Sequence, residues 1–158
     1  MNVSLRENNG DGTFANPIYP GGKTGRDSHG ISFIDINNDG LPDLAISVGA
    51  DGGQGSGPKE FYKNTGNGFE QINPGEVLED TLGRGRSIMP CDLSKDGWMD
   101  VAMLNFGVKK NSHRFAVSEN AEGTSCSDIG NVLGVATEKA GGAMLVDLFN
   151  DGSDYLLV

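Results

Sequence analysis

The stretch DINNDGLPDLAI, residues 35–46, places an oxygen-bearing side chain at every second position, turns at a glycine and ends in an apolar run. Alternate side chains of a tight loop converge on one centre, and Ca²⁺ takes about six to eight oxygen ligands from carboxylates, amides and backbone carbonyls. Gly40, at position 6 of the loop, allows the sharp turn that such a loop needs. The spacing therefore predicts a calcium loop. Its ligands would be Asp35, Asn37, Asp39 and Asp43 at positions 1, 3, 5 and 9, with the carbonyl of Leu41 at position 7.

The same pattern returns twice, as DLSKDGWMDVAM from Asp92 and as DLFNDGSDYLLV from Asp147, so the three copies start 57 and 55 residues apart. The second copy predicts a calcium site formed by Asp92, Ser94, Asp96 and Asp100, with the carbonyl of Trp98. The third copy has Phe149 at position 3 and Tyr155 at position 9. We therefore expect weak calcium binding or none from its remaining acids, which are Asp147, Asp151 and Asp154.

Two other interpretations compete with a calcium loop of this kind. An EF-hand needs a glutamate at position 12 and flanking helices, whereas position 12 is Ile46 in the first copy and Met103 in the second. Turns rich in Asn, Asp and Gly also form for backbone reasons alone. The oxygen spacing that the first two copies share favours a bound cation over a simple polar turn.

A second feature repeats in step with the loops. Asn8, Asn64 and Asn120 each begin or precede a glycine-containing turn, and they lie 56 residues apart. Each whole period contains four β-prone runs, at residues 31–35, 43–48, 60–64 and 69–72, and again at 86–92, 100–105, 113–119 and 124–129. Four short strands in a repeat of this length are typical of a β-propeller blade. The sequence thus predicts an all-β fold made of four-stranded antiparallel blades.

The repeats begin and end in the middle of a blade. Residues 30–73 and 86–127 each supply a whole blade, whereas residues 1–14 supply only a second half and residues 142–158 only a first half. Two blades and two halves do not close a ring of the usual four to eight. We expect a single propeller segment of about three blades' worth. It is either cut from a longer propeller, or its open half-blades pair within or between chains, which would be a route to self-association.

Composition narrows the class of partner. The chain has 158 residues, of which 25 are glycine and 36% are hydrophobic, so it can form a core despite its many turns. Its 22 acidic and 12 basic residues give a net charge of −10, which argues against nucleic acid and favours cations. No apolar run reaches the ~18–20 residues of a membrane span, and no signal peptide is visible.

No group of residues forms a catalytic constellation. The run RDSH, residues 26–29, holds Asp, Ser and His as neighbours, whereas the members of a catalytic triad converge from separate segments. The glycine-rich run at 49–57 lacks the Lys-Ser/Thr ending of a phosphate-binding loop. We therefore expect a protein that is not an enzyme. The alternative is a segment of a secreted polysaccharide lyase or hydrolase whose catalytic residues this sequence does not reveal.

The aspartate loop that enters an apolar strand, followed by an Asn-Gly hairpin, resembles the FG-GAP or VCBS repeats of integrin α-subunit propellers and of many bacterial surface and secreted proteins. The resemblance covers nearly the whole chain, and only the third copy departs from it. It implies a seven-bladed, calcium-stabilised propeller in the parent protein, with the metal loops on one face and ligands met by loops on the other. It also implies an extracellular, cell-surface or periplasmic location.

The face opposite the calcium loops is where we expect a partner, because loops on a rigid scaffold usually carry recognition. This face would be built from residues 15–29, 49–58, 73–85, 106–112 and 128–141. The cationic residues expected in or next to these segments are Arg26, His29, Arg84, Arg86, Lys109 and Lys110. The sequence therefore predicts a calcium-stabilised adhesion or binding module that recognises a protein or a carbohydrate.

Overall fold

A computed structural model describes residues 3–22, 26–50, 55–73, 75–106, 115–120, 126–128 and 142–157. Nearly all regular structure in these residues is antiparallel β-sheet, with one short helix, α1 (Glu76–Glu79). Two four-stranded sheets and one two-stranded sheet follow each other along the chain. The predicted all-β class with four-stranded antiparallel sheets is therefore confirmed.

Each four-stranded sheet is a simple meander in which every strand pairs with the next. The first sheet contains β1 (Asp27–Ile34), β2 (Asp43–Ala50), β3 (Glu60–Asn64) and β4 (Phe69–Ile72). The second contains β5 (Gly85–Cys91), β6 (Asp100–Asn105), β7 (Phe115–Asn120) and β8 (Cys126–Asp128). The two-stranded sheet is formed by β9 (Met144–Val146) and β10 (Tyr155–Leu157). An N-terminal hairpin is closed by bridges from Leu5 to Ile18 and from Asn8 to Phe14.

One strand differs clearly from its predicted limits. Strand β1 begins at Asp27, four residues before the predicted run at 31–35, so part of the segment 15–29 is strand and not loop. The added residues, Asp27 to Gly30, pair with the end of β2 through an irregular register. These residues are polar, so the sequence gave no sign of a strand here. Pairing with the buried β2 holds them extended.

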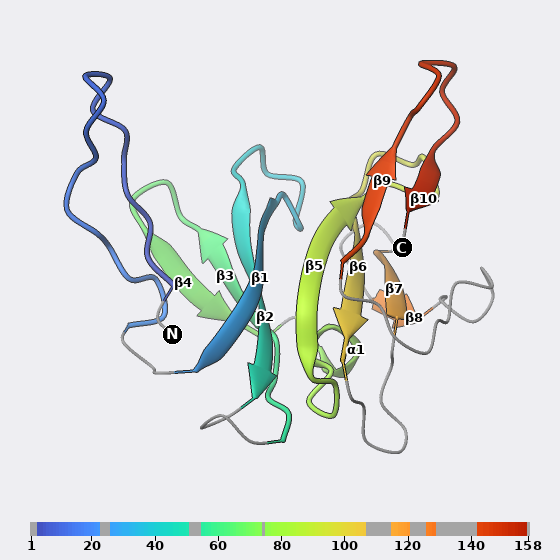
Figure 1. The fold of residues 1–158 in the computed structure, drawn as a ribbon, viewed down its shortest axis with the longest axis horizontal. Coiled ribbons are helices and arrows are strands. Elements are labelled where there is room, and N and C mark those ends of the chain that lie inside the picture. The colour runs from blue at the N-terminus through green and yellow to red at the C-terminus, as the bar shows by residue number, and fades with distance from the viewer. Residues whose placement is uncertain are drawn as a thin grey trace.

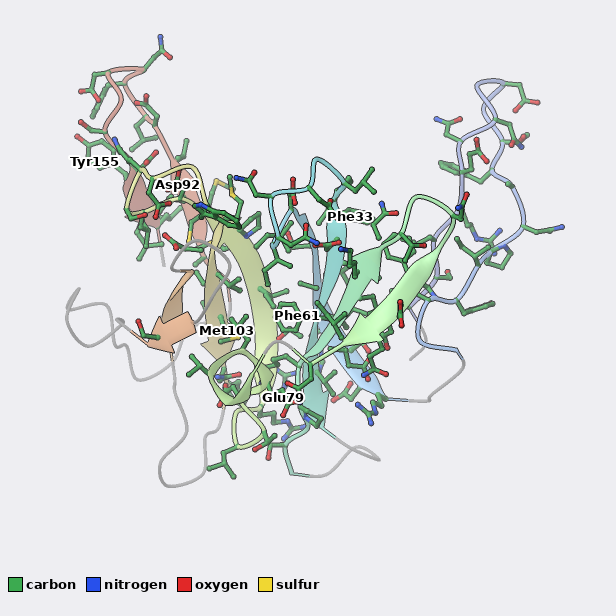
Figure 2. The ribbon with its side chains drawn as sticks, turned by 180° about the vertical axis from the view of Figure 1, so that it is seen from behind. Phe33, Phe61, Glu79, Asp92, Met103 and Tyr155 are labelled. Atoms are coloured by element: carbon green, nitrogen blue, oxygen red, sulfur yellow. The ribbon has the colours of Figure 1, made fainter. Side chains whose placement is uncertain are left out.

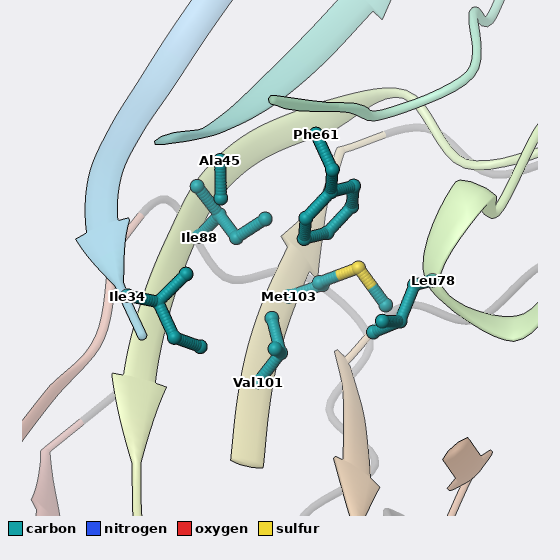
Figure 3. Packing of buried hydrophobic residues seen from close by; sticks show 7 residues of the cluster. All are labelled: Ile34, Ala45, Phe61, Leu78, Ile88, Val101 and Met103. Atoms are coloured by element: carbon teal, nitrogen blue, oxygen red, sulfur yellow. The ribbon is translucent and has the colours of Figure 1, made fainter. Parts of the chain in front are cut away.

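Strands β2 and β6 are largely apolar because each is buried on both faces, and their polar residues Asp43, Ser47, Asp100 and Asn105 are buried as well. In β6, Val101 and Met103 face the first sheet, while Ala102 and Leu104 face β9 and β10. The same alternation in β2 places Leu44, Ile46 and Val48 against the N-terminal segment at Val3. The cluster between the two large sheets contains Ile34, Ala45, Phe61, Leu78, Ile88, Val101 and Met103 (Figure 3). The N-terminal hairpin, the two sheets and the β9–β10 pair therefore stand side by side (Figure 1).

The two large sheets are joined most tightly along β1 and β5. A Cβ added at Gly30 in β1 would lie 2.7 Å from the Cα of Ser87 in β5, so only glycine fits at this point. Near the far end of the sheets, the buried Lys59 side chain donates to the carbonyls of Asp80 at 3.2 Å and of Gly83 at 2.8 Å. Lys59 lies beside β3, and Asp80 follows α1, so this contact fixes the connection between the sheets.

Candidate functional site

The three aspartate loops lie at the same end of the sheets. Loops 35–42 and 92–99 join the first and second strands of the two large sheets, and loop 147–154 joins β9 to β10. They lie along the upper edge of Figure 1. Figure 2 shows Asp92 and Tyr155 at this end and Glu79 at the other, with Phe61 and Met103 between them.

The three loops share one backbone conformation. The carboxylate at position 1 accepts the backbone N–H groups of positions 5 and 6. These bonds measure 3.0 and 2.8 Å in the Asp35 loop, 3.2 and 3.1 Å in the Asp92 loop, and 3.1 and 2.9 Å in the Asp147 loop. Position 4 has a positive φ of 55°, 58° and 54° in the three loops, and the glycine at position 6 has φ of 85°, 87° and 83°. The repeat seen in the sequence is therefore a repeat of geometry.

Oxygen atoms at positions 1, 3 and 5 of the first loop lie close together. The backbone N–H of Asp39 lies 3.0 Å from Oδ1 of Asp35 and 3.2 Å from Oδ1 of Asn37. The N–H of Leu41, 3.0 Å from Asp39, lowers the pKa of the Asp39 carboxyl, which stays ionised at neutral pH. A carboxylate has about four lone-pair sites, so these bonds leave capacity for a cation. The donor set fits Ca²⁺, which prefers oxygen ligands.

The aspartate at position 9 is buried and serves the backbone. Asp43, with 2% of its surface exposed, accepts the N–H of Ile36 at 3.2 Å and the N–H of Asn64 at 2.7 Å. The first bond closes the loop, and the second ties it to the end of β3. Burial raises the pKa of Asp43. Asp100, with 0% exposed, accepts the N–H of Leu93 at 2.9 Å in the same way.

The third loop replaces two of the ligand positions with aromatic rings. Phe149 at position 3 and Tyr155 at position 9 pack edge to face, with ring centroids 5.5 Å apart. Asp154 is exposed, in contrast to the buried Asp43 and Asp100. Asp147 and Asp151 keep the shared hydrogen bonds to the loop backbone. The contact between the two rings shows that positions 3 and 9 meet in space, and it gives this loop an apolar closure.

Hydrogen bonds to the loop backbone bring together only some of the residues predicted as ligands: Asp35, Asn37 and Asp39 in the first loop, Asp92 and Asp96 in the second, and Asp147 and Asp151 in the third. Among the described residues, no group of three or more His, Cys, Asp or Glu side chains is arranged to hold a metal ion. The carboxylates at position 9 accept backbone N–H groups. In the first loop, two of the predicted ligands are the Asn37 amide and the Leu41 carbonyl, which are not side chains of those four types. The calcium ligand sets stay a prediction.

The cationic residues predicted for the opposite face are largely engaged with neighbours. Arg26 pairs with the buried Glu60, with Nη1 and Oε1 2.6 Å apart. His29 lies 3.0 Å from Asp27, and its hydrogen bond lowers the pKa of the Asp27 carboxyl. Arg86 contacts His29. Both residues lie in strands rather than in loops, His29 in β1 and Arg86 in β5. Lys109 and Lys110 lie outside the described residues.

Three residues nevertheless lie together at the ends of β1, β5 and β6, and this group is here called the arginine patch. Its members are His29, Arg86 and Phe106, and the Asp27 carboxylate lies 3.0 Å from His29. The Arg86 guanidinium lies 5.4 Å from the centre of the Phe106 ring, and this ring is 46% exposed. Because these strands run antiparallel, their ends here are opposite to the ends that carry the first two aspartate loops. The sequence predicted that the basic residues lie on the recognition face. It placed Phe106 only within the loop segment 106–112 and gave it no role.

Lys59 is a cation whose position the sequence did not reveal. Its side chain is 0% exposed and its Nζ lies 3.5 Å from Oδ2 of Asp80, which also accepts a bond from Asn105. Burial lowers the pKa of Lys59. It therefore belongs to the buried connection between the two large sheets and takes no part in the arginine patch.

Comparison with known families identifies the repeat. Residues 1–46 match the sequence model of the FG-GAP-like repeat. The chain carries an FG-GAP-like repeat. The match spans the N-terminal hairpin, β1, the first aspartate loop and the start of β2, so the predicted resemblance to FG-GAP repeats is confirmed over these residues. No match was found among curated proteins. Within the described residues, no helix has the length and apolar character needed to cross a membrane.

The bonds of Asp43 predict an effect on stability that needs no metal. In EGTA, Asp43→Ala leaves two backbone N–H groups without their acceptor, so we expect a loss of about 2–4 kcal/mol in the free energy of unfolding. Asp154→Ala, which removes an exposed aspartate from the third loop, should change it by no more than about 0.5 kcal/mol. Urea unfolding followed by circular dichroism measures both. Equal effects from the two substitutions would contradict the role assigned to Asp43.

Proposed function

We propose that this FG-GAP repeat protein is a calcium-stabilised, non-catalytic recognition module that binds its partner on the face opposite the aspartate loops. An FG-GAP-like repeat suggests an extracellular binding or adhesion module. The observation that carries the finer proposal is the shared geometry of the aspartate loops, each anchored at the same end of a sheet. Because the aspartate loop has the same conformation at three equivalent places, we assign it a structural role in the scaffold.

Calcium is proposed for the first two loops and not for the third. Asp35, Asn37 and Asp39, with the Leu41 carbonyl, would hold the ion in the first loop, and the matching residues of the Asp92 loop would hold a second. When bound, Ca²⁺ supplies positive charge that offsets the repulsion among the clustered carboxylates. The Phe149–Tyr155 contact supplies the corresponding closure in the third loop without a cation.

The arginine patch is the proposed recognition surface. The Arg86 guanidinium can pair with a carboxylate or sulfate group through two parallel hydrogen bonds. Phe106 adds an exposed ring next to these charges, and rigid aromatic surfaces beside polar groups are typical of binding sites. The chain is acidic overall, so a cationic patch is unusual on its surface. We assign it an anionic partner, such as an acidic polysaccharide or an acidic segment of a protein.

Thermal melting tests the calcium proposal. A ligand that binds only the folded state stabilises it by about 2.7 kcal/mol at 100 times its Kd, which is about 5–10 °C in Tm for a chain of this size. We expect CaCl₂ to raise Tm relative to EGTA by at least this amount. Asp39→Ala and Asp96→Ala should each remove a large part of the rise, whereas Asp151→Ala at the same position of the third loop should leave it unchanged. An unchanged Tm in CaCl₂ would refute the proposal.

Binding to acidic polysaccharides tests the recognition surface. We expect the calcium-loaded protein to bind at least one of heparin, alginate and polygalacturonate, and Arg86→Ser to weaken that binding by about tenfold. Lys63→Ser is the matched control, because it also removes one positive charge. Lys63 lies at the aspartate-loop end, with its Nζ 3.3 Å from the carboxylate of Asp39. Biolayer interferometry measures both affinities. Equal losses for the two variants would mean that net charge, and not the patch, accounts for binding.

A further inference from the structure

One residue in the first strand of each large sheet stands outside the ladder. In β1 the register with β2 shifts between Ser28 and Gly30, so the pairing skips His29. In β5 the register with β6 shifts in the same way and skips Arg86. His29 and Arg86 are 57 residues apart, which is also the spacing of the first two aspartate loops. The repeat thus carries the same irregularity twice, and such irregularities re-aim a side chain, often beside a functional site.

The two irregularities bring the side chains of His29 and Arg86 together. Nη1 of Arg86 contacts Nε2 of the His29 ring, and Oδ2 of Asp27 lies 3.0 Å from the same ring nitrogen. Gly49 of β2 lies against the ring, because a Cβ added there would be 2.5 Å from its Cδ2 and 2.7 Å from its Nε2. Glycine at this position therefore leaves room for the ring. The His29 side chain is 30% exposed, so protons from solvent reach it.

The Nε2 atom of His29 cannot serve both of its neighbours at once. Arginine has donors only, so the contact with Arg86 requires a neutral ring whose Nε2 carries no proton and whose Nδ1 does. In the charged ring both nitrogens carry protons. Nε2 then donates to Asp27 and offers no acceptor to Arg86, whose charge it also repels. The charge on His29 therefore decides which of the two neighbours it holds.

The charged groups around the ring favour this exchange. Within the part of the chain that the structure describes, they are Asp27 on the same strand, Arg86 on β5, and Arg84 just before β5. The hydrogen bond from His29 lowers the pKa of the Asp27 carboxyl most, and the charges of Arg86 and Arg84 lower it further, so Asp27 stays ionised and able to accept. Histidine is the side chain that ordinarily changes its charge between about pH 5 and 8.

We propose that His29 controls the Arg86 guanidinium by taking up a proton, so that the arginine patch binds a carboxylate or sulfate group more tightly when His29 is charged. This inference rests on the proposed recognition surface. At high pH the neutral ring holds Arg86. At low pH the ring pairs with Asp27, and the guanidinium, beside the Phe106 ring, is released for the ligand. The affinity is therefore greatest below the titration of His29 and falls as the pH rises through it.

Nuclear magnetic resonance of the free protein tests the control of Arg86 without any ligand. At about pH 8, ¹⁵N–¹H spectra of the His29 ring should show a proton on Nδ1 and none on Nε2. As the pH falls, the side-chain N–H signals of Arg86 should shift with the same midpoint as the His29 ring. In His29→Gln these Arg86 signals should not titrate, while circular dichroism shows that the fold is kept. A neutral ring with its proton on Nε2, or Arg86 signals that do not follow His29, would overturn the proposal.

Binding at two pH values tests the effect on the ligand. Heparin is the probe, because its sulfate groups keep their charge over this range. At fixed ionic strength and CaCl₂ concentration, we expect the Kd for heparin to be about tenfold lower at about pH 5.5 than at about pH 7.5. His29→Gln should reduce this ratio to less than about twofold, whereas His113→Gln, which removes the other histidine of the chain, should keep it. Biolayer interferometry measures these affinities.

The two experiments separate this inference from the proposed function. Equal pH dependence in the parent and in His29→Gln would overturn the inference, because the general loss of negative charge at low pH would then explain it. Tight binding that does not change with pH would overturn the inference and leave the recognition surface in place. No binding at either pH would refute the recognition surface and with it the pH-dependent binding, and the spectra of the free protein would still decide whether His29 controls Arg86.

Discussion

The buried carboxylate at position 9 of the first two aspartate loops is the constraint on which the two large sheets depend. Asp43 sits at the first residue of β2 and accepts backbone N–H groups from the loop and from the end of β3. A buried carboxylate is costly unless hydrogen bonds satisfy it, so its position fixes both partners. Once the loop is closed at this point, the oxygens at positions 1, 3 and 5 are held on the outside of the same turn.

The third loop shows what happens when that carboxylate is replaced. Tyr155 stands at position 9, and its ring packs against Phe149 rather than accepting backbone N–H groups. The hydrogen bonds of Asp147 still hold the turn, because they depend only on positions 1, 5 and 6. The loop conformation and the proposed cation site are therefore separable properties, and the repeat conserves the first of them in all three copies.

Much of the fold could be predicted from the sequence because the repeat and the burial pattern act locally. The limits of β3, β4 and β6 follow from apolar runs between turn residues. The first residues of β1 could not be predicted, because their extended form comes from pairing with β2. Lys59 and the Phe149–Tyr155 contact were also beyond the sequence, since each depends on which distant residues the sheets bring together. The spacing of Asp43 suggested a ligand, but its bonds to backbone N–H groups appear only in the structure.

The amides of Gly40, Gly97 and Gly152 report on the three loops separately, because each donates to the position-1 carboxylate of its own loop. A titration with CaCl₂, followed by ¹⁵N–¹H correlation spectra, is the most direct test of the proposed calcium sites. The amides of Gly40 and Gly97 should shift and reach saturation, while that of Gly152 stays in place over the same range. Three amides that do not move, or a Gly152 amide that moves with the other two, would contradict the account.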